Sequence, residues 1–144
     1  MPILYSVIAR GTTVLTKFAS CPGNFSEVTE QVIEKIPPEN AKLTYSHGSY
    51  LFHYICEDRI IYMCITDDEF ERSRAFLYLN EIKRRFVSTY GVRAQTAIAY
   101  SMNTEFSRIL ANEMVSVSYV TSPGLNFVLV KAMLAKMKNR VYEL

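Results

Sequence analysis

The chain has 144 residues, of which 49% are apolar and 21% charged, and its 16 lysines and arginines nearly balance its 14 aspartates and glutamates. This composition is typical of a globular protein and excludes a disordered or collagen-like chain. A net charge of +2 gives no reason to expect nucleic acid as a partner, since proteins that bind it usually carry a strong basic excess. The length predicts one domain of ordinary size, with room for a short appendage.

The cysteines and the apolar stretches indicate a cytoplasmic protein. Cys21, Cys56 and Cys64 are too few and odd in number for a disulfide scaffold, so we expect reduced thiols. No stretch reaches the roughly 18 unbroken apolar residues that cross a bilayer as a helix. Pro2 stands where a myristoylation motif needs glycine, and the end of the sequence has no prenylation cysteine. We therefore expect a chain without a membrane anchor of its own.

Taken in chain order, the first predicted elements are two strands and a helix. Arg10-Gly11 is a predicted hairpin turn between two β-rich runs. The helix begins after Asn24, a predicted N-cap residue whose spacing to Glu27 is that of a capping box, and it stops at Pro37. Three more strands follow before the second helix. The predicted strands span residues 1–9, 12–20, 42–47, 50–57 and 60–66.

Two further helices complete the predicted domain. Asp68 begins a second capping-box spacing, so the longest helix is predicted to start there, and Gly91 ends it. Asn103 or Thr104 caps a third helix. Residues 60–65 are apolar on both faces of their strand, which requires covering layers on both sides of the sheet. The order therefore predicts an α+β fold, an α-β-α sandwich around one mainly antiparallel sheet.

Residues suited to catalysis or metal binding are scarce. His47 and His53 are the only histidines, whereas a metal site needs three or four convergent ligands, and His53 is predicted to be a core residue with one satisfied nitrogen. The glycines are scattered singly, so neither a phosphate-binding loop nor a nucleophile elbow is present. Asp67-Asp68 favours capping over a catalytic carboxylate pair, and Lys83-Arg84-Arg85 favours a solvated basic face over a phosphate site. We expect no catalytic residue, no cofactor and no metal.

A surface argument singles out Ile33, Leu43 and Tyr45. Leu43 and Tyr45 share one face of a predicted strand. An α-helix turns by about 100° per residue, which places Ile33 at the flank of the buried stripe of the helix that precedes this strand. Either all three are core residues, or they line a half-covered groove that accepts an apolar peptide or helix. The spacing alone leaves both alternatives open.

The sequence changes in character after Met114. We predict a domain over residues 1–114 and a divergent tail over residues 115–144. Leu125 to Leu144 has helical spacing, with an apolar side and a basic remainder. Three outcomes stay open for this tail: it packs into the groove of the domain, it stays unpacked, or it lies on an anionic membrane surface.

Six long runs of the sequence carry a family resemblance: Ala9–Thr13, Gly23–Gln31, Lys42–Gly48, Tyr50–Cys56, Ile65–Phe76 and Thr89–Thr96. They resemble the longin domain of the tetanus-insensitive R-SNARE proteins, over about residues 1–114. The resemblance implies a longin (profilin-like) fold, with a five-stranded antiparallel sheet that has one helix on one face and two on the other. It also implies a domain without enzymatic activity.

The resemblance implies a function in vesicle-mediated transport and membrane fusion, as a regulatory and sorting module. In that family an apolar groove between the first helix and the third strand binds the protein's own SNARE segment or a sorting adaptor, and Leu43 and Tyr45 occupy the matching positions. We therefore expect SNARE helices and adaptor proteins as partners of a monomer, peripheral to endosomal, lysosomal and secretory vesicle membranes. Membrane contact is expected only through partners or the basic tail.

The tail departs from the family's pattern. Residues 115–144 do not resemble the SNARE motif and transmembrane anchor with which the family continues, and they are similar to an ending produced by different splicing. An alternative that this departure favours is a stand-alone longin-like subunit of a tethering or coat complex. An enzyme is the third hypothesis.

Overall fold

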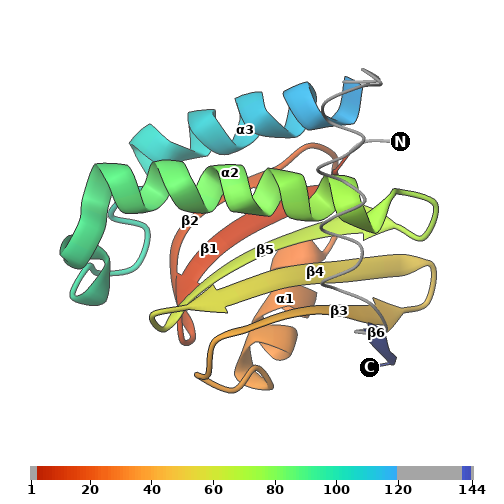
Figure 1. Cartoon of the computed structure of the whole chain (residues 1–144), viewed down its shortest axis with the longest axis horizontal. Coiled ribbons are helices and arrows are strands. Elements are labelled where there is room, and N and C mark those ends of the chain that lie inside the picture. Colours follow the sequence, from red (N-terminus) through yellow and green to blue (C-terminus); the bar gives the residue numbers. More distant parts are fainter. Residues whose placement is uncertain (1–2, 120–140, 144) are drawn as a thin grey trace.

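The computed structural model describes residues 3–119 and 141–143. Within them the chain forms one sheet, three α-helices and a 3₁₀ helix, which is the predicted α+β sandwich (Figure 1). The elements are β1 (Tyr5–Arg10), β2 (Thr13–Ala19), α1 (Phe25–Glu34), β3 (Ala41–His47), β4 (Tyr50–Glu57), β5 (Ile60–Asp67), α2 (Arg72–Tyr90), η1 (Gly91–Gln95), α3 (Asn103–Tyr119) and β6 (Val141–Glu143).

The sheet has the strand order β2-β1-β5-β4-β3-β6. β1 to β5 pair antiparallel throughout, as predicted, with β5 between β1 and β4. A sixth strand that was not predicted extends the sheet, because β6 pairs in parallel with the outer edge of β3. β3 is therefore the last of the antiparallel strands, and its partner on the outer side comes from the far end of the chain.

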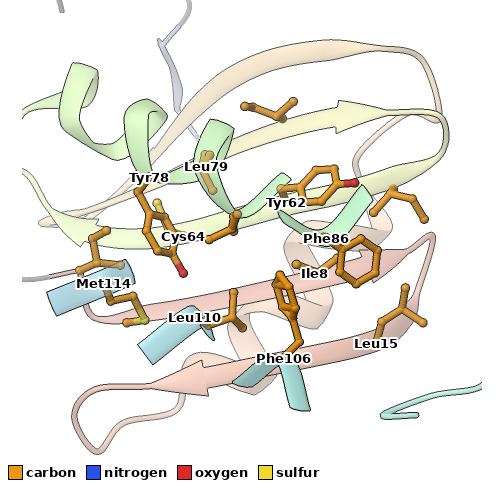
Figure 2. Packing of buried hydrophobic residues seen from close by; sticks show 14 of the residues in the cluster. Ile8, Leu15, Tyr62, Cys64, Tyr78, Leu79, Phe86, Phe106, Leu110 and Met114 are labelled. Atoms are coloured by element: carbon orange, nitrogen blue, oxygen red, sulfur yellow. The ribbon is translucent and has the colours of Figure 1, made fainter. Parts of the chain in front are cut away.

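The helices cover both faces of the sheet, and each face has its own apolar core. Figure 1 shows α2 and α3 on one face and α1 on the other. The larger core lies under α2 and α3 and contains Phe76, Phe86 and Phe106, each at most 1% exposed. Figure 2 shows several of its side chains between these helices and the sheet. The smaller core, between α1 and the sheet, includes Val32, Phe52 and Tyr54 among other residues.

The helix starts differ in part from the predicted capping. α1 follows Asn24 as predicted, but the Asn24 side chain makes no capping hydrogen bond, and its ψ of 34° is not the extended value of an N-cap residue. α2 starts at Arg72, four residues after the predicted start at Asp68. The reason is that Asp67 Oδ1 accepts hydrogen bonds from the amides of Glu69 and Phe70, at 3.1 and 2.9 Å, and so holds a turn ahead of the helix. The aspartates therefore do not cap α2 itself.

The ends of α2 and α3 can be compared with the predicted end of the long helix and with the predicted domain boundary. Gly91 ends α2 with a φ of 54°, as predicted for a residue in the left-handed region. α3 continues without a break past Met114, which is 2% exposed against the larger core. Of the predicted tail helix, residues 125–140 and 144 lie outside the described residues, and Val141–Glu143 are strand rather than helix. The division into residues 1–114 and 115–144 stays a prediction.

Candidate protein-binding face

Strand β3 presents two half-buried apolar side chains beside α1. Leu43 and Tyr45 point to the same side of the strand, and both pack against the core that lies between α1 and the sheet. The Tyr45 ring stacks on Tyr54, with centroids 5.9 Å apart and an interplanar angle of 15°. Leu43 and Tyr45 therefore pack against core residues on one side and remain partly exposed on the other. We call the surface formed by these two side chains the β3 face.

The third predicted groove residue has a different environment. Ile33 belongs to the same core on the α1 side, so the structure brings all three residues to one side of the sheet. Ile33 is only 3% exposed, however. It supports the β3 face from within and offers almost no surface of its own to a partner.

The outer edge of β3 is paired with a segment of the same chain. Thr44, Tyr45 and Ser46 stand opposite the three residues of β6 in a parallel register. An edge strand exposes a row of unpaired amides and carbonyls that can accept a further strand. The structure thus shows that this edge accepts a strand next to the β3 face. Sequence reasoning missed this feature, because three residues are too few for a recognisable alternation.

The opposite side of β3 is tied to the centre of the sheet by a buried histidine. His53 Nδ1 lies 3.0 Å from Thr44 Oγ1, and His53 Nε2 lies 2.9 Å from Thr66 Oγ1. Thr66 donates its hydroxyl proton to the carbonyl of Asp67, at 2.9 Å, so it accepts from Nε2–H. Nδ1 consequently accepts from the Thr44 hydroxyl. Both ring nitrogens are satisfied, one more than predicted.

Burial keeps this histidine neutral. His53 is fully buried, and burial lowers its pKa to about 3, with a smaller contribution from the positive charge of Arg72. The ring therefore cannot serve as a proton shuttle near neutral pH. It links β3, β4 and β5 below the β3 face.

The described residues can also be compared with the requirements of metal binding and nucleophilic attack. No set of three histidine, cysteine, aspartate or glutamate side chains among them could hold a metal ion. Burial raises the pKa of both the Cys56 and the Cys64 thiols, which makes them poor nucleophiles. No helix in this part of the chain is long and apolar enough to cross a bilayer.

Comparison with known proteins identifies the family. The family model described as "Longin: Regulated-SNARE-like domain" matches residues 15–110. The chain is 70% identical to vesicle-associated membrane protein 7 of Gallus gallus and 69% identical to that of Homo sapiens, each over 114 residues that make up 79% of this chain and 52% of the relative. It is 46% identical to vesicle-associated membrane protein 7B of Dictyostelium discoideum, over 79% of this chain and 44% of that relative. The chain spans about half the length of these relatives. It belongs to the longin family.

Proposed function

We propose that this chain is a non-enzymatic regulatory and sorting module of SNARE-dependent vesicle transport, and that it binds SNARE segments or sorting adaptors through the β3 face. Its place of action is the cytoplasmic side of endosomal, lysosomal and secretory vesicle membranes. The observation that carries the proposal is the position of Leu43 and Tyr45. They are half-buried apolar side chains on a sheet edge that accepts a further strand.

The geometry fits a partner that is captured by apolar contacts. Apolar side chains on a firm support dominate the free energy of such interfaces. Tyr45 has this support, because it rests on the fully buried ring of Tyr54. The relatives are vesicle-associated membrane proteins, which supports a partner in the vesicle fusion machinery.

β6 adds a regulatory element to this proposal. It pairs with β3 at Tyr45, the residue that also contributes to the β3 face. A partner that adds its own strand at this position has to displace β6 first. The chain's own segment therefore competes with the partner, and the competition lowers the apparent affinity.

The proposal is tested by the double substitution Leu43→Ser with Tyr45→Ser. The binding partner is the part of the human relative outside the 114 matched residues, and affinity is measured by isothermal titration calorimetry. We expect at least about a tenfold loss of affinity, because two apolar anchors are removed, and a tenfold change corresponds to about 1.4 kcal/mol. The folded state is checked by near-UV circular dichroism.

The matched control is Ile98→Ser with Val115→Ser, two apolar side chains that are 76% and 59% exposed elsewhere on the surface. It should leave the affinity unchanged. Unchanged affinity in the Leu43 and Tyr45 variant would contradict the proposal. If that variant unfolds, the two residues belong to the core, as the other sequence-based alternative holds.

A further inference from the structure

A pocket lies on the side of the sheet opposite to the β3 face. Its volume is about 920 Å³, and pockets of this size hold drug-sized molecules or several peptide side chains. Its walls come from the β4–β5 turn, the C-terminal half of α2 and η1. Figure 1 places the turn and η1 at the same end of the sheet. We call this hollow the end pocket.

The end pocket contains a tyrosine hydroxyl that has no hydrogen-bond partner among the described residues. Tyr62 lines the pocket, is 1% exposed, and packs edge-on against Phe86 with ring centroids 6.0 Å apart. Its hydroxyl makes no hydrogen bond with the described residues, and in Figure 2 it points away from Cys64 and Tyr78. Burial raises its pKa, so the group keeps its proton. The hydroxyl keeps contact with solvent, so water can satisfy it in the free pocket, and a ligand oxygen that accepts its proton takes the place of this water.

Part of the rim of the end pocket is apolar, and this part is held in place. Val87 and Val92 line the pocket, although they are 55% and 85% exposed. η1 is held against the sheet, because Arg10 donates a hydrogen bond to the carbonyl of Ala94 at 2.7 Å and Gln95 donates one to the carbonyl of Asp58 at 2.8 Å. A small enclosed ligand leaves such a rim in water, whereas a peptide that crosses the mouth covers it. The rim therefore favours a peptide.

The charges at the mouth leave one cation available. Lys83 pairs with Glu57 at 2.7 Å, and Arg84 pairs with a glutamate of its own helix at 2.6 Å. The side chains of Asp58 and Arg59 make no ion pair or hydrogen bond with the described residues. The guanidinium of Arg59 can therefore bind a carboxylate. The neighbouring carboxylate of Asp58 repels the same ligand, whereas that of Glu57 is paired with Lys83.

The β4–β5 turn fixes the position of these two residues. Asp58 and Arg59 are the loop residues of a two-residue hairpin, because Glu57 and Ile60 pair with each other. Their φ values of 51° and 70° are those of a type I′ turn, which joins two antiparallel strands closely. The tight turn holds both charged residues at the mouth of the end pocket.

We propose that the end pocket binds an extended peptide of a partner protein that carries a bulky apolar side chain next to a carboxylate. The apolar side chain enters beside Tyr62 and Phe86, a peptide carbonyl accepts the hydrogen bond of the Tyr62 hydroxyl, and the carboxylate pairs with Arg59. This site is separate from the β3 face. Its occupation and that of the β3 face can be measured independently.

The test is a nuclear magnetic resonance titration of the ¹⁵N-labelled full chain with three blocked tetrapeptides, Gly-Phe-Glu-Gly, Gly-Phe-Gln-Gly and Gly-Ala-Glu-Gly. We expect the Phe-Glu peptide to shift the amide signals of Tyr62, Val87 and Val92 with a dissociation constant of about 1 mM or below. The other two peptides should bind at least about fivefold more weakly, because each lacks either the charge or the apolar side chain.

Substitutions in the pocket test which residues bind the Phe-Glu peptide. Tyr62→Phe and Arg59→Gln should each lower the affinity for the Phe-Glu peptide about threefold or more. Arg59→Lys keeps the positive charge and should retain most of the affinity. Asp58→Asn should strengthen it, because the repelling carboxylate is removed. Arg108→Gln, an exposed cation on α3 outside the pocket, is the matched control and should change nothing.

Several results would overturn the proposal. They are no shift of the pocket amides by any peptide, equal binding of the Phe-Glu and Phe-Gln peptides, or loss of affinity in Arg108→Gln equal to that in Arg59→Gln. Octanoate is added as a free amphiphile, and binding tighter than that of the Phe-Glu peptide would assign the pocket to a fatty acid instead. Leu43→Ser with Tyr45→Ser should leave the pocket titration unchanged, so a failure here is distinguishable from a failure of the β3 face.

Discussion

At the scale of single residues, His53 is a buried polar group that connects three strands of the sheet. It carries hydrogen bonds to both neighbouring strands, and its ring also meets the Phe76 ring edge-on, with centroids 5.8 Å apart. Buried polar groups of this kind stabilise a fold only while every partner is in place. Protonation would put a second N–H where Thr44 now donates and would bury a positive charge, so the network favours the neutral ring.

The lowered pKa of His53 predicts a pH-dependent stability. The unfolded chain takes up a proton near pH 6.5, whereas the folded chain resists it down to about pH 3. The stabilisation is therefore complete above pH 6.5 and is lost as the pH falls, with a limiting slope of about 1.4 kcal/mol per pH unit. Urea denaturation should show a free energy of unfolding that is about 2 kcal/mol lower at pH 5 than at pH 7 from this residue alone.

The control for this prediction separates the two histidines. His53→Gln removes the titrating ring, so the difference between pH 7 and pH 5 should shrink by that amount, although the variant is less stable at both pH values. His47→Gln changes an exposed histidine at the end of β3 and should leave the difference as it is. The account is wrong if the His53 variant keeps the full pH dependence.

Phe76 anchors α2 to the sheet. The side chain is 1% exposed, and we expect Phe76→Ala to lower the free energy of unfolding by about 3–5 kcal/mol, the cost of truncating a buried aromatic residue. Val87→Ala, on the same helix but 55% exposed, should change it by less than about 0.5 kcal/mol. The two variants are compared by the midpoint of urea denaturation, provided that the dependence of the unfolding free energy on urea concentration is the same in both. A Phe76 variant as stable as the parent chain would show that α2 does not pack as described.

At the scale of elements, the pairing of β6 with β3 decides how open the sheet edge is. Alternate amides of a strand point to opposite sides, so two consecutive prolines remove one amide that faces β3. We predict that Val141→Pro with Tyr142→Pro speeds hydrogen exchange in residues 41–47, measured by mass spectrometry. The matched variant Val141→Thr with Tyr142→Thr keeps both amides and should retain the slow exchange. Equal exchange in the two variants would mean that β6 does not protect this edge.

Much of the fold could be predicted, because local signals and final structure agree. The strand that is apolar on both faces, β5, lies inside the sheet, and Gly91 ends α2. The start of α2 was misplaced, since the spacing after Asp68 does not reveal that Asp67 caps a turn. β6 escaped prediction because its pairing is long-range and its three residues carry no pattern.

The two candidate sites could also be predicted only in part. Strand alternation correctly placed Leu43 and Tyr45 on one side of β3, but helical spacing could not distinguish the flank position of Ile33 from full burial. The end pocket could not be predicted, since its walls come from three separate segments. The turn at Asp58 and Arg59 was recognisable, whereas its left-handed backbone was not, because neither residue is glycine.

At the scale of the whole molecule, one sheet separates the two proposed binding surfaces. The β3 face lies on the α1 side, and the end pocket lies under α2 and η1 on the other side. The buried layer between them includes His53, which links the outer strand to the centre. If both proposals hold, a partner at one surface leaves the other accessible, and we expect the two sites to be occupied independently.

The most direct test of the central claim maps where the partner binds on the full chain. The ¹⁵N-labelled chain is titrated with the part of the human relative outside the 114 matched residues, and amide shifts are recorded by nuclear magnetic resonance. The account predicts that shifts concentrate on α1 and β3, around Leu43 and Tyr45, and that the amides of β6 change as this strand is displaced. Shifts confined to α2 and α3, or no shifts at all, would contradict it.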